Sequence, residues 1–454
     1  MNILILGAGS TGVELARLLS VENHNIVLVD KSDEKLKIVN NTLDIKTVIG
    51  HTTDINILQE AGIKNADILI SVTDVDELNI TACQIAKKIY KTKITIASVS
   101  NATYYQSDIA KSILNDIDFA ISKNIETSKI IKRILSISGA RDVVSFLDGN
   151  IKAIGVTCNK NAPLAGVKIK FISAIDKENK LAIIYIKRKN FQGIIPGKSD
   201  EILAGDEVYF ICDANDIEYA MSLFGYVNDT KNNILVIGGE ELCSDIIDDN
   251  ILQTANIKFI EQNLHGTKHL NELQNIEFIQ GHMLDVDLLI NSGIRDTDLM
   301  LALTNDDKTN ITLCQLSKKL GCKRTSALLN DFSNLKLFQA FEINSILNAN
   351  NIITSKIVHF IKSNDSESIL SFDNDEIELF LMEVDKNSHA VGILIEDIIS
   401  ENEVYVAAIA RDNQVIIMPK LQVLRTGDNV VFISNKNSKQ KITELFKIPP
   451  RYLI

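Results

Sequence analysis

The sequence predicts an α/β fold of two doubly wound parallel-sheet lobes, each followed by a small α+β module. Short apolar strands alternate with helices along residues 1–123, and residues 232–350 repeat that pattern. Each of these segments precedes a more strand-rich one. Strands that alternate with helices form parallel sheets. We therefore expect nucleotide-binding lobes at 1–123 and 232–350, and small modules at 140–227 and 366–450.

The first thirty residues have the pattern of a nucleotide-binding strand–turn–helix unit. The apolar run Met1–Leu6 leads into a G-x-G-x-x-G turn, Gly7-Ala8-Gly9-Ser10-Thr11-Gly12, and a stretch with helical spacing follows. In such a unit the first glycine permits the tight turn and the second lets a pyrophosphate approach the backbone. The third lets the helix pack close to the sheet. The helix N-terminus offers N–H groups and the positive end of its dipole to phosphates.

The next apolar run ends at Asp30, 18 residues after Gly12 (30 − 12). That is near the spacing expected for the acid that accepts hydrogen bonds from a ribose diol. We therefore expect a Rossmann-like dinucleotide site, with a structural turn in an empty domain as the alternative. Ser10 and Thr11 are assigned as N–H and hydroxyl donors to the pyrophosphate, and Asp30 as the ligand of the adenosine ribose.

The rest of the first lobe supplies further candidates. Strands are expected at 47–49, 68–72 and 94–97, and helices at 34–39, 54–61 and 79–90. Ligands of such sheets bind beyond the carboxyl ends of the strands. Candidate side chains at or near those ends, completing the set, are Lys31, His51, Thr53, Thr73, Asp74 and Ser98.

Several of these residues have a second interpretation. Lys31 lies beside the adenine or in solvent, with equal weight. For His51, a place beside the nucleotide or in helix capping is favoured over acid–base catalysis. Asp76, Glu77 and Asn79 cap the next helix or touch ligand. Asp76 and Asn79 recur as Asp307 and Asn310 in the second lobe, which favours capping.

The second lobe is a duplicate of the first. Gly281-His282 repeats Gly50-His51 at an offset of 231 (281 − 50), and Glu261 repeats Asp30 at the same offset. Residues 303–319 match 72–88 without a gap, at about half of their positions. The turn has degenerated, however, and reads Gly238-Gly239-Glu240-Glu241-Leu242-Cys243. Only the first glycine survives, and Glu240 replaces Gly9, so we expect no ordinary dinucleotide binding there.

The modules repeat as well. A turn at Gly205-Asp206 leads into an apolar strand, and Gly427-Asp428 does the same in the second half. The basic run 187–189 lies between apolar runs and is interpreted as a solvated hairpin turn.

Composition and residue patterns argue against several classes of protein, namely nucleic-acid-binding, membrane-spanning, disulfide-bonded and metal-binding proteins. A net charge of −12 argues against a nucleic-acid partner. No apolar run approaches the length of a membrane span, and no signal peptide is apparent, so we expect a cytosolic chain. The cysteines have no C-x-x-C spacing and are expected to be reduced and mostly buried. The histidines show no metal-binding pattern, and His265 and His269 are interpreted as surface residues.

The chain resembles the TrkA family, the peripheral nucleotide-binding subunits of bacterial Trk potassium-uptake systems. The resemblance covers essentially the whole chain, with lobes similar to RCK (KTN) N-terminal domains and modules similar to RCK C-terminal domains. It rests on the repeat order and on these motifs: Gly7 to Gly12, Asp30, Gly50-His51, Ala61-Gly62, Val72-Thr73, Asp76-Glu77 and Asn79.

The resemblance implies a function and an assembly. It implies that the first lobe binds NAD(H) and adenine nucleotides such as ATP or ADP. It also implies a homo-oligomeric ring, a tetramer, that gates an integral-membrane potassium-translocating Trk subunit from the cytoplasmic face. The family usually has an arginine facing the nucleotide about where Ser98 stands, so the nucleotide preference is left open.

Two alternatives to this regulatory role agree less well with the sequence. An NAD-dependent oxidoreductase needs a substrate domain with an acid–base group, yet the first module has no histidine and the second has only His389. A redox-sensing DNA-binding regulator conflicts with the acidic charge and the lack of a helix-turn-helix. The sequence therefore favours a non-enzymatic nucleotide sensor.

Overall fold

The chain forms two compact units. A computed structural model describes residues 1–21, 24–106, 108–188, 191–226, 232–247, 255–262, 276–341, 343, 345–362, 367–372, 376–400, 402–412, 414–419 and 421–446. Met1–Lys132 and Asn232–Ile361 form one unit, and Arg133–Lys231 and Lys362–Ile454 form the other. The first unit thus contains the two lobes, and the second contains the two modules. Lys189, His265 and His269 lie outside the described residues.

The first lobe is a six-stranded parallel sheet in the order β3-β2-β1-β4-β5-β6. Its strands are β1 (Asn2–Leu6), β2 (Asn25–Asp30), β3 (Lys46–Ile49), β4 (Ile68–Ser71), β5 (Ile94–Ser98) and β6 (Phe119–Ile121). Its main helices are α1 (Ser10–Ser20), α2 (Asp33–Asn40), α3 (Ile55–Glu60) and α4 (Asp76–Ile85). The strand order reverses direction between β1 and β4, which is where such sheets bind ligands.

The second lobe repeats this topology, with the order β15-β14-β13-β16-β17-β18. Its strands are β13 (Asn232–Ile237), β14 (Ala255–Glu261), β15 (Ile276–Gln280), β16 (Leu299–Ala302), β17 (Thr325–Leu329) and β18 (Ser345–Asn348). Helices α10 (Glu240–Ile246), α12 (Val286–Asn291), α13 (Asp307–Leu320) and α14 (Leu335–Ala340) accompany them. The two predicted doubly wound parallel sheets are therefore confirmed.

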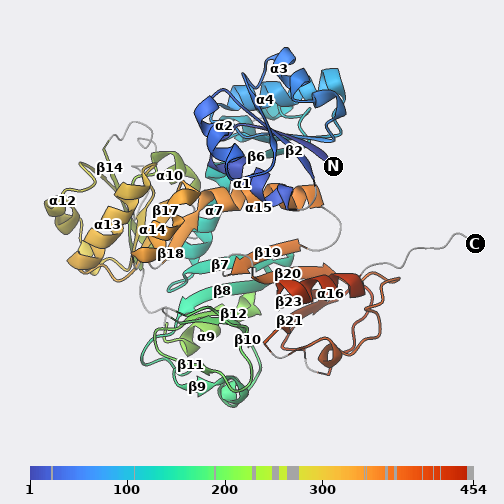
Figure 1. Cartoon of the computed structure of the whole chain (residues 1–454). Coiled ribbons are helices and arrows are strands. Elements are labelled where there is room, and N and C mark those ends of the chain that lie inside the picture. The colour runs from blue at the N-terminus through green and yellow to red at the C-terminus, as the bar shows by residue number, and fades with distance from the viewer. Residues whose placement is uncertain are drawn as a thin grey trace, which may run out of the picture. The chain divides into compact units, whose positions relative to one another are not determined.

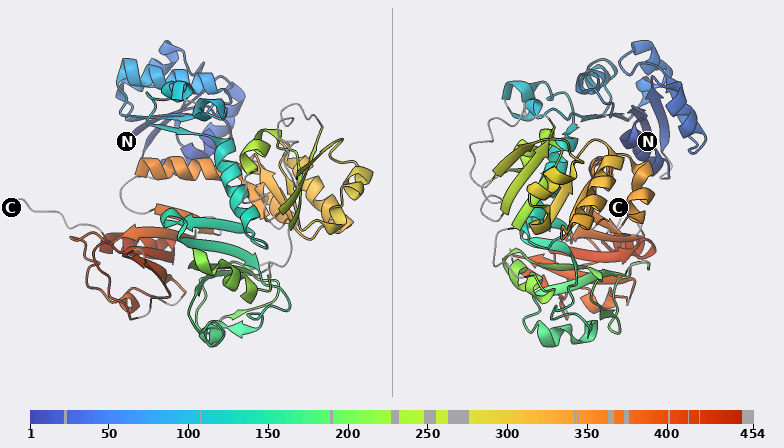
Figure 2. Two further views of the ribbon diagram at one scale, coloured as in Figure 1. Left: turned by 180° about the vertical axis from the view of Figure 1, so that it is seen from behind. Right: turned by 90° about the vertical axis from the view of Figure 1, so that its left-hand side faces the viewer.

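Helix α15 (Ala349–Lys362) joins the two lobes within their unit. It follows the last strand of the second lobe but runs beside the first lobe (Figures 1 and 2). Its Ile353 and Ile357 are buried in a core cluster with residues of β1, β2 and α1. Phe360 stacks on Phe119 of β6 with ring centroids 4.5 Å apart. The first lobe therefore needs a helix from the second repeat to complete its core.

Helix α7 (Lys123–Ser136) makes the reciprocal contact. It follows the first lobe, and its Asn124 donates to Glu241 of the second lobe at 3.1 Å. Its Glu126 forms ion pairs with Lys129 and, on α15, with Lys356. The two lobes are thus related by an exchange of helices that their separate sequences do not reveal.

Each module is built on an antiparallel sheet. The first has the order β10-β12-β8-β7, with β7 (Asp142–Phe146), β8 (Ile151–Thr157), β10 (Leu181–Lys187) and β12 (Glu207–Asp213), beside the pair β9 (Val167–Lys168) and β11 (Glu201–Ile202). The second has the order β19-β20-β23-β21-β22, with β19 (Glu367–Phe372), β20 (Ile377–Glu383), β21 (Val404–Arg411), β22 (Gln414–Ile417) and β23 (Asn429–Asn435). Helices α9 (Ile217–Leu223) and α16 (Lys436–Phe446) follow β12 and β23.

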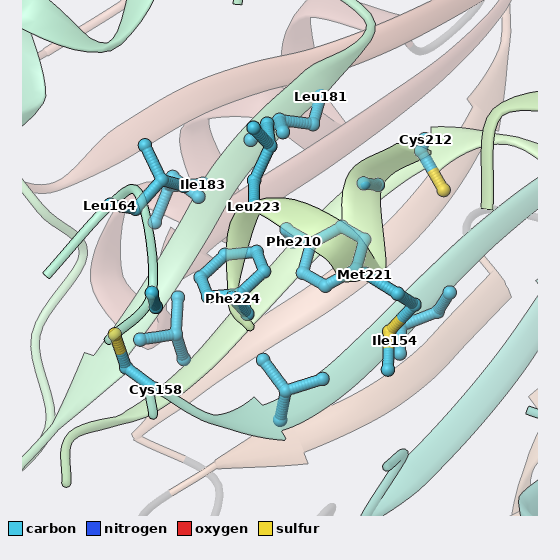
Figure 3. Packing of buried hydrophobic residues seen from close by; sticks show 14 of the residues in the cluster. Ile154, Cys158, Leu164, Leu181, Ile183, Phe210, Cys212, Met221, Leu223 and Phe224 are labelled. Carbon is cyan, nitrogen blue, oxygen red and sulfur yellow. The ribbon is translucent and has the colours of Figure 1, made fainter. Parts of the chain in front are cut away.

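The apolar faces of these sheets form the cores of the modules. In the first module Phe210 stacks on Phe224, with ring centroids 5.0 Å apart, inside a cluster that includes Leu181, Ile183 and Met221 (Figure 3). A second cluster contains buried residues of both modules, and the Tyr185 ring stacks there on the Phe372 ring. The two modules therefore share one core.

In the Gly-Asp turn of each module, a buried aspartate pairs with an arginine, which is partly exposed in the first module and largely buried in the second. The Nε of Arg188 donates to both carboxylate oxygens of Asp206, at 3.1 and 3.2 Å. Asp206 is buried and also accepts from the backbone N–H of Leu203. Arg188, which was interpreted as part of a solvated turn, is 41% exposed but also pairs with this buried carboxylate. Its side chain closes the turn, because a buried carboxylate requires a charged or hydrogen-bonding partner.

All six cysteines are buried free thiols, as expected for a reduced chain. Burial raises the pKa of the Cys158 and Cys322 thiols to about 11. At pH 8, about one thiol in a thousand with such a pKa would be ionised, and the thiolate is the reactive form. We expect iodoacetamide at pH 8 to leave the native chain unmodified by mass spectrometry and to label six thiols after denaturation. Rapid labelling of one native cysteine would contradict this burial.

Candidate functional site

A crevice lies at the carboxyl ends of β1, β2, β3 and β4, at the point where the strand order reverses. Its lining consists of glycines, a few charged or polar side chains and an apolar wall: Gly7, Gly9, Asp30, Lys31, Lys35, Gly50, His51, Thr52, Val72, Thr73, Asp74, Val75 and Leu78. Seven of the residues proposed from the sequence line it, namely Gly7, Gly9, Asp30, Lys31, His51, Thr73 and Asp74. Their role as ligands of a nucleotide stays a prediction.

The three positions of the first turn are occupied by glycine for different structural reasons. Gly7 has a φ of +107°, which L side chains rarely adopt. A Cβ on Gly12 would come within 1.9 Å of the Gly7 carbonyl oxygen, so only glycine allows α1 to start this close to the sheet. A Cβ on Gly9 would meet no atom within 4 Å, and its φ is an ordinary −75°. The fold therefore needs Gly7 and Gly12, whereas Gly9 leaves open space at the crevice.

Asp30 ties the glycine turn to the end of β2. Its carboxylate accepts from the backbone N–H of Ala8 at 2.6 Å and from that of Ser32 at 2.8 Å. The residue is only 9% exposed, yet it lines the crevice. Since each carboxylate oxygen has a second acceptor position, these bonds leave capacity for a ribose hydroxyl. Asp30 thus positions the turn, whether or not a ligand is bound.

The hydroxyls of Ser10 and Thr11 form hydrogen bonds with Asn350, which is not part of the crevice lining. Thr11 Oγ1 donates to Oδ1 of Asn350 at 3.1 Å, and Nδ2 of Asn350 donates to Ser10 Oγ at 2.9 Å. The assignment of the Thr11 hydroxyl as a phosphate donor therefore fails for this arrangement, because its hydrogen is already used. The backbone N–H groups of the first turn of α1 have no acceptor within the helix and remain suited to an anion.

Asp76 and Asn79 do not cap α4, so the capping interpretation is wrong. The N-cap is Val75, which makes no side-chain capping bond. Asn79 is fully buried and instead joins two strand ends, donating to the carbonyls of Thr73 and Ser98 at 2.9 and 2.8 Å. Asp76 accepts from backbone N–H groups of the loop after β5. Asn310 and Asp307 make the same kinds of bond in the second lobe.

We expect Asn79→Ala to destabilise the first lobe by about 3 kcal/mol, because buried backbone groups would lose their partners at about 1–3 kcal/mol each. The measurement is amide exchange of β4 and β5 as a function of denaturant. Asn310→Ala is the matched control, and it should cost a similar amount in the second lobe only. A change below about 0.5 kcal/mol in both variants would contradict this role.

Two of the remaining predicted residues, Thr53 and Ser98, lie outside the crevice lining. His51 Nδ1 is 3.0 Å from the Thr53 hydroxyl, so Thr53 supports His51 instead of lining the crevice itself. Ser98 ends β5, and its carbonyl accepts from Asn79, outside the lining set. Sequence reasoning missed Lys35, although its i, i+4 spacing from Lys31 was a usable signal. It also missed Thr52 and the apolar residues Val72, Val75 and Leu78.

The degenerate turn of the second lobe is rebuilt. Cys243 occupies the position of Gly12, where a Cβ cannot fit, and the turn responds with two left-handed glycines, Gly238 at +77° and Gly239 at +82°. Helix α10 begins at Glu240, whose backbone N–H donates to the Glu261 carboxylate at 3.0 Å. Burial raises the pKa of Glu261 above its ordinary value. In this turn, Glu240 replaces the glycine that leaves space for a phosphate in the first lobe, and the first N–H of the helix is already bound to Glu261.

Among the described residues, no helix is both long and apolar enough to cross a membrane. No group of three or more His, Cys, Asp or Glu side chains in that part of the chain could hold a metal ion.

Comparison with known proteins adds family relationships to this geometry. The TrkA-N domain model matches residues 3–123 and 234–349, and the TrkA-C domain model matches 154–225. The Trk system potassium uptake protein TrkA of Azorhizobium caulinodans is 29% identical, over 99% of both chains. The protein of the same name from Vibrio alginolyticus is 29% identical over 100% of both.

Solved structures show the same fold. The GsuK RCK domain aligns over 98% of this chain and 94% of its own, with a TM-score of 0.61 and 19% identity. The GsuK channel bound to NAD aligns over 98% and 78%, with a TM-score of 0.60 and 18% identity.

Proposed function

The chain belongs to the TrkA-N domain family, and on this premise we propose that it is a regulatory subunit of potassium uptake that binds an adenine dinucleotide in its first lobe. The resemblance to TrkA noted in the sequence is confirmed by relatives of that name over the full chain. Their name connects them to potassium uptake, and the GsuK channel, a structure of similar fold, has been solved bound to NAD. These relationships support the proposal for this chain.

The crevice at Gly9 is the observation that carries the proposal. The fold does not require glycine at this position, since a Cβ there would meet nothing within 4 Å. A side chain at this point would, however, fill the space in front of the first turn of α1. Leaving that space open suits a pyrophosphate bound to the helix N-terminus. NAD(H) is the proposed ligand, with ATP or ADP able to use the same adenosine and phosphate contacts.

The proposed roles follow from the lining. The N–H groups that follow Gly9 hold the pyrophosphate, and Asp30 accepts from the adenosine ribose. Lys31 and Lys35 lie four residues apart and line the same crevice, so they supply positive charge near the phosphates and the adenine. Thr73 and Asp74 form its middle. We propose no role for Ser98 or Thr53 beyond supporting their neighbours.

The proposed mechanism is a shift between two conformations of a homo-oligomer. A nucleotide that binds one conformation more tightly changes the populations by the ratio of its two affinities. The altered conformation would then open or close a membrane Trk-type potassium-translocating subunit, to which the chain is bound peripherally on the cytoplasmic side. No catalytic step is required, and His51, the acid–base candidate in the crevice, is exposed and paired with Thr53.

The test is rubidium uptake into vesicles that contain the Trk-type membrane subunit from the same organism. We expect uptake to depend on the added chain and to change with NADH or NAD at constant ATP. An uptake rate that is the same with and without the chain, and with and without nucleotide, would contradict the regulatory role. Steady oxidation of NADH by the purified chain with a small carbonyl substrate would favour an oxidoreductase instead.

A further inference from the structure

Asn350, the second residue of α15, contacts both lobes of the first unit. It is 2% exposed. Its amide nitrogen donates to Ser10 Oγ at 2.9 Å and also to the carbonyl oxygen of Asn330. Its amide oxygen accepts from Thr11 Oγ1 at 3.1 Å. One buried side chain therefore joins the glycine turn of the first lobe to the second lobe.

The direction of these bonds separates the roles of the two hydroxyls. A hydroxyl has one hydrogen to donate and two acceptor positions. Thr11 uses its hydrogen on Asn350. Ser10 accepts from Asn350, so its own hydrogen remains available for another acceptor. A phosphate at the N-terminus of α1 is such an acceptor. It would be connected through Ser10 to Asn350 by a series of hydrogen bonds.

This series of hydrogen bonds ends at the carboxyl ends of two strands in the second lobe. Asn330 follows β17, and its backbone N–H donates to Oδ1 of Asp307 at 2.7 Å. Its side chain donates to the carbonyl of Thr304 at 3.0 Å. These bonds close the carboxyl ends of β16 and β17. A change at the glycine turn can therefore reach those strand ends through Asn350 and Asn330.

The reciprocal link is weaker. Asn124, the second residue of α7, donates one exposed bond to Glu241 at 3.1 Å. The matching segments 124–130 and 351–357 pair Asn124 with Asn351, and they pair Asn350 with Lys123. The rebuilt turn of the second lobe has Glu241 and Leu242 at the positions of Ser10 and Thr11, so it has no pair of hydroxyls to bind. In the described part of the chain, the turn of the second lobe thus receives one exposed bond from α7, whereas the turn of the first lobe receives the buried bonds of Asn350.

We propose that Asn350 is a positioning residue through which a ligand in the first crevice changes the second lobe. The inference rests on the proposed nucleotide site. Ligand binding that draws on Ser10 alters its bond with Asn350, and this changes how tightly Asn350 holds Asn330. Coupling of this kind is reciprocal, so the state of the second lobe also sets the affinity of the first.

The experiment is hydrogen–deuterium exchange of the full chain with and without saturating NADH. Two segments are compared: 5–13, which contains the glycine turn, and 325–334, which contains β17 and Asn330. In the native chain we expect NADH to slow exchange in both, by at least about fivefold in 325–334, the lower end of ordinary coupling between sites. Asn350→Asp keeps the shape of the side chain but has no N–H to donate. It should retain the protection of 5–13 and lose that of 325–334.

Two further variants complete the design. Asn350→Ala tests the same loss without a new carboxylate, and Asn124→Ala should preserve both effects. Protection of 325–334 that survives in Asn350→Asp and Asn350→Ala, or that is lost equally in Asn124→Ala, would overturn the role of Asn350. Native protection of 5–13 alone would overturn the coupling but not the nucleotide site. Absence of binding, seen by calorimetry, would overturn the nucleotide site itself and the coupling with it.

Discussion

Gly9→Glu is expected to abolish dinucleotide binding while leaving the chain folded. The substitution introduces into the first lobe the residue that the second lobe has at Glu240. A Cβ at this position meets no atom within 4 Å and the backbone conformation is ordinary, so we expect the variant to fold. A carboxylate about 4 Å from a phosphate opposes it by about 4 kcal/mol at an effective dielectric near 20, about a thousandfold in affinity. Calorimetric titration with NADH measures the loss.

Gly9→Gln is the matched control, because it has the same size without the charge. We expect it to weaken binding less than Gly9→Glu, and the difference isolates the electrostatic part. Thermal unfolding of both variants should follow that of the native chain within a few degrees. Equal binding by native protein and Gly9→Glu would place the nucleotide elsewhere.

Asp428→Ala is expected to destabilise the second module by about 3–5 kcal/mol, because it leaves a largely buried arginine without its partner. Arg411 donates through Nε and Nη2 to the two oxygens of Asp428, both at 2.7 Å. Asp428 is 1% exposed, and it also accepts from the backbone N–H of Arg425. The carboxylate beside it raises the pKa of Arg411, so the guanidinium stays charged. Amide exchange of β21 and β23 under denaturant measures the loss.

The control is an exposed ion pair. Asp33 and Lys37 are four residues apart on α2, at 2.6 Å, with side chains 51% and 72% exposed. Such pairs contribute about 0.3–0.5 kcal/mol. Asp33→Ala should therefore change the free energy of unfolding by about a tenth of the effect of Asp428→Ala. A similar loss in the free energy of unfolding in both variants would contradict the idea that the buried pair stabilises the chain more than the exposed one.

The sequence predicted what depends on local chemistry. The alternation of strands and helices gave the doubly wound sheets, and the offset of 231 residues gave the duplication. The turn from Gly7 to Gly12 could be predicted because all of its defining glycines lie within six consecutive residues. Lys35 was missed although the same local spacing could have found it.

The rest depends on partners that are distant in sequence. Arg188 was assigned to solvent because its buried partner, Asp206, lies 18 residues away in the turn before β12. Asn79 looked like a helix cap because its true partner, the carbonyl of Ser98, lies 19 residues away on β5. Thr11 looked like a phosphate ligand because Asn350, 339 residues later, reaches it from a helix of the other repeat. No periodicity or motif reports such contacts.

The central claim is that the first lobe, and only the first, holds an adenine dinucleotide. Its most direct test is calorimetric titration of the full chain with NADH, run beside Gly9→Glu and Glu240→Gly. We predict saturation at one site per chain, lost in Gly9→Glu and unchanged in Glu240→Gly, because Cys243 would still prevent the ordinary turn. Two sites per chain, or one site that survives in Gly9→Glu, would contradict the account.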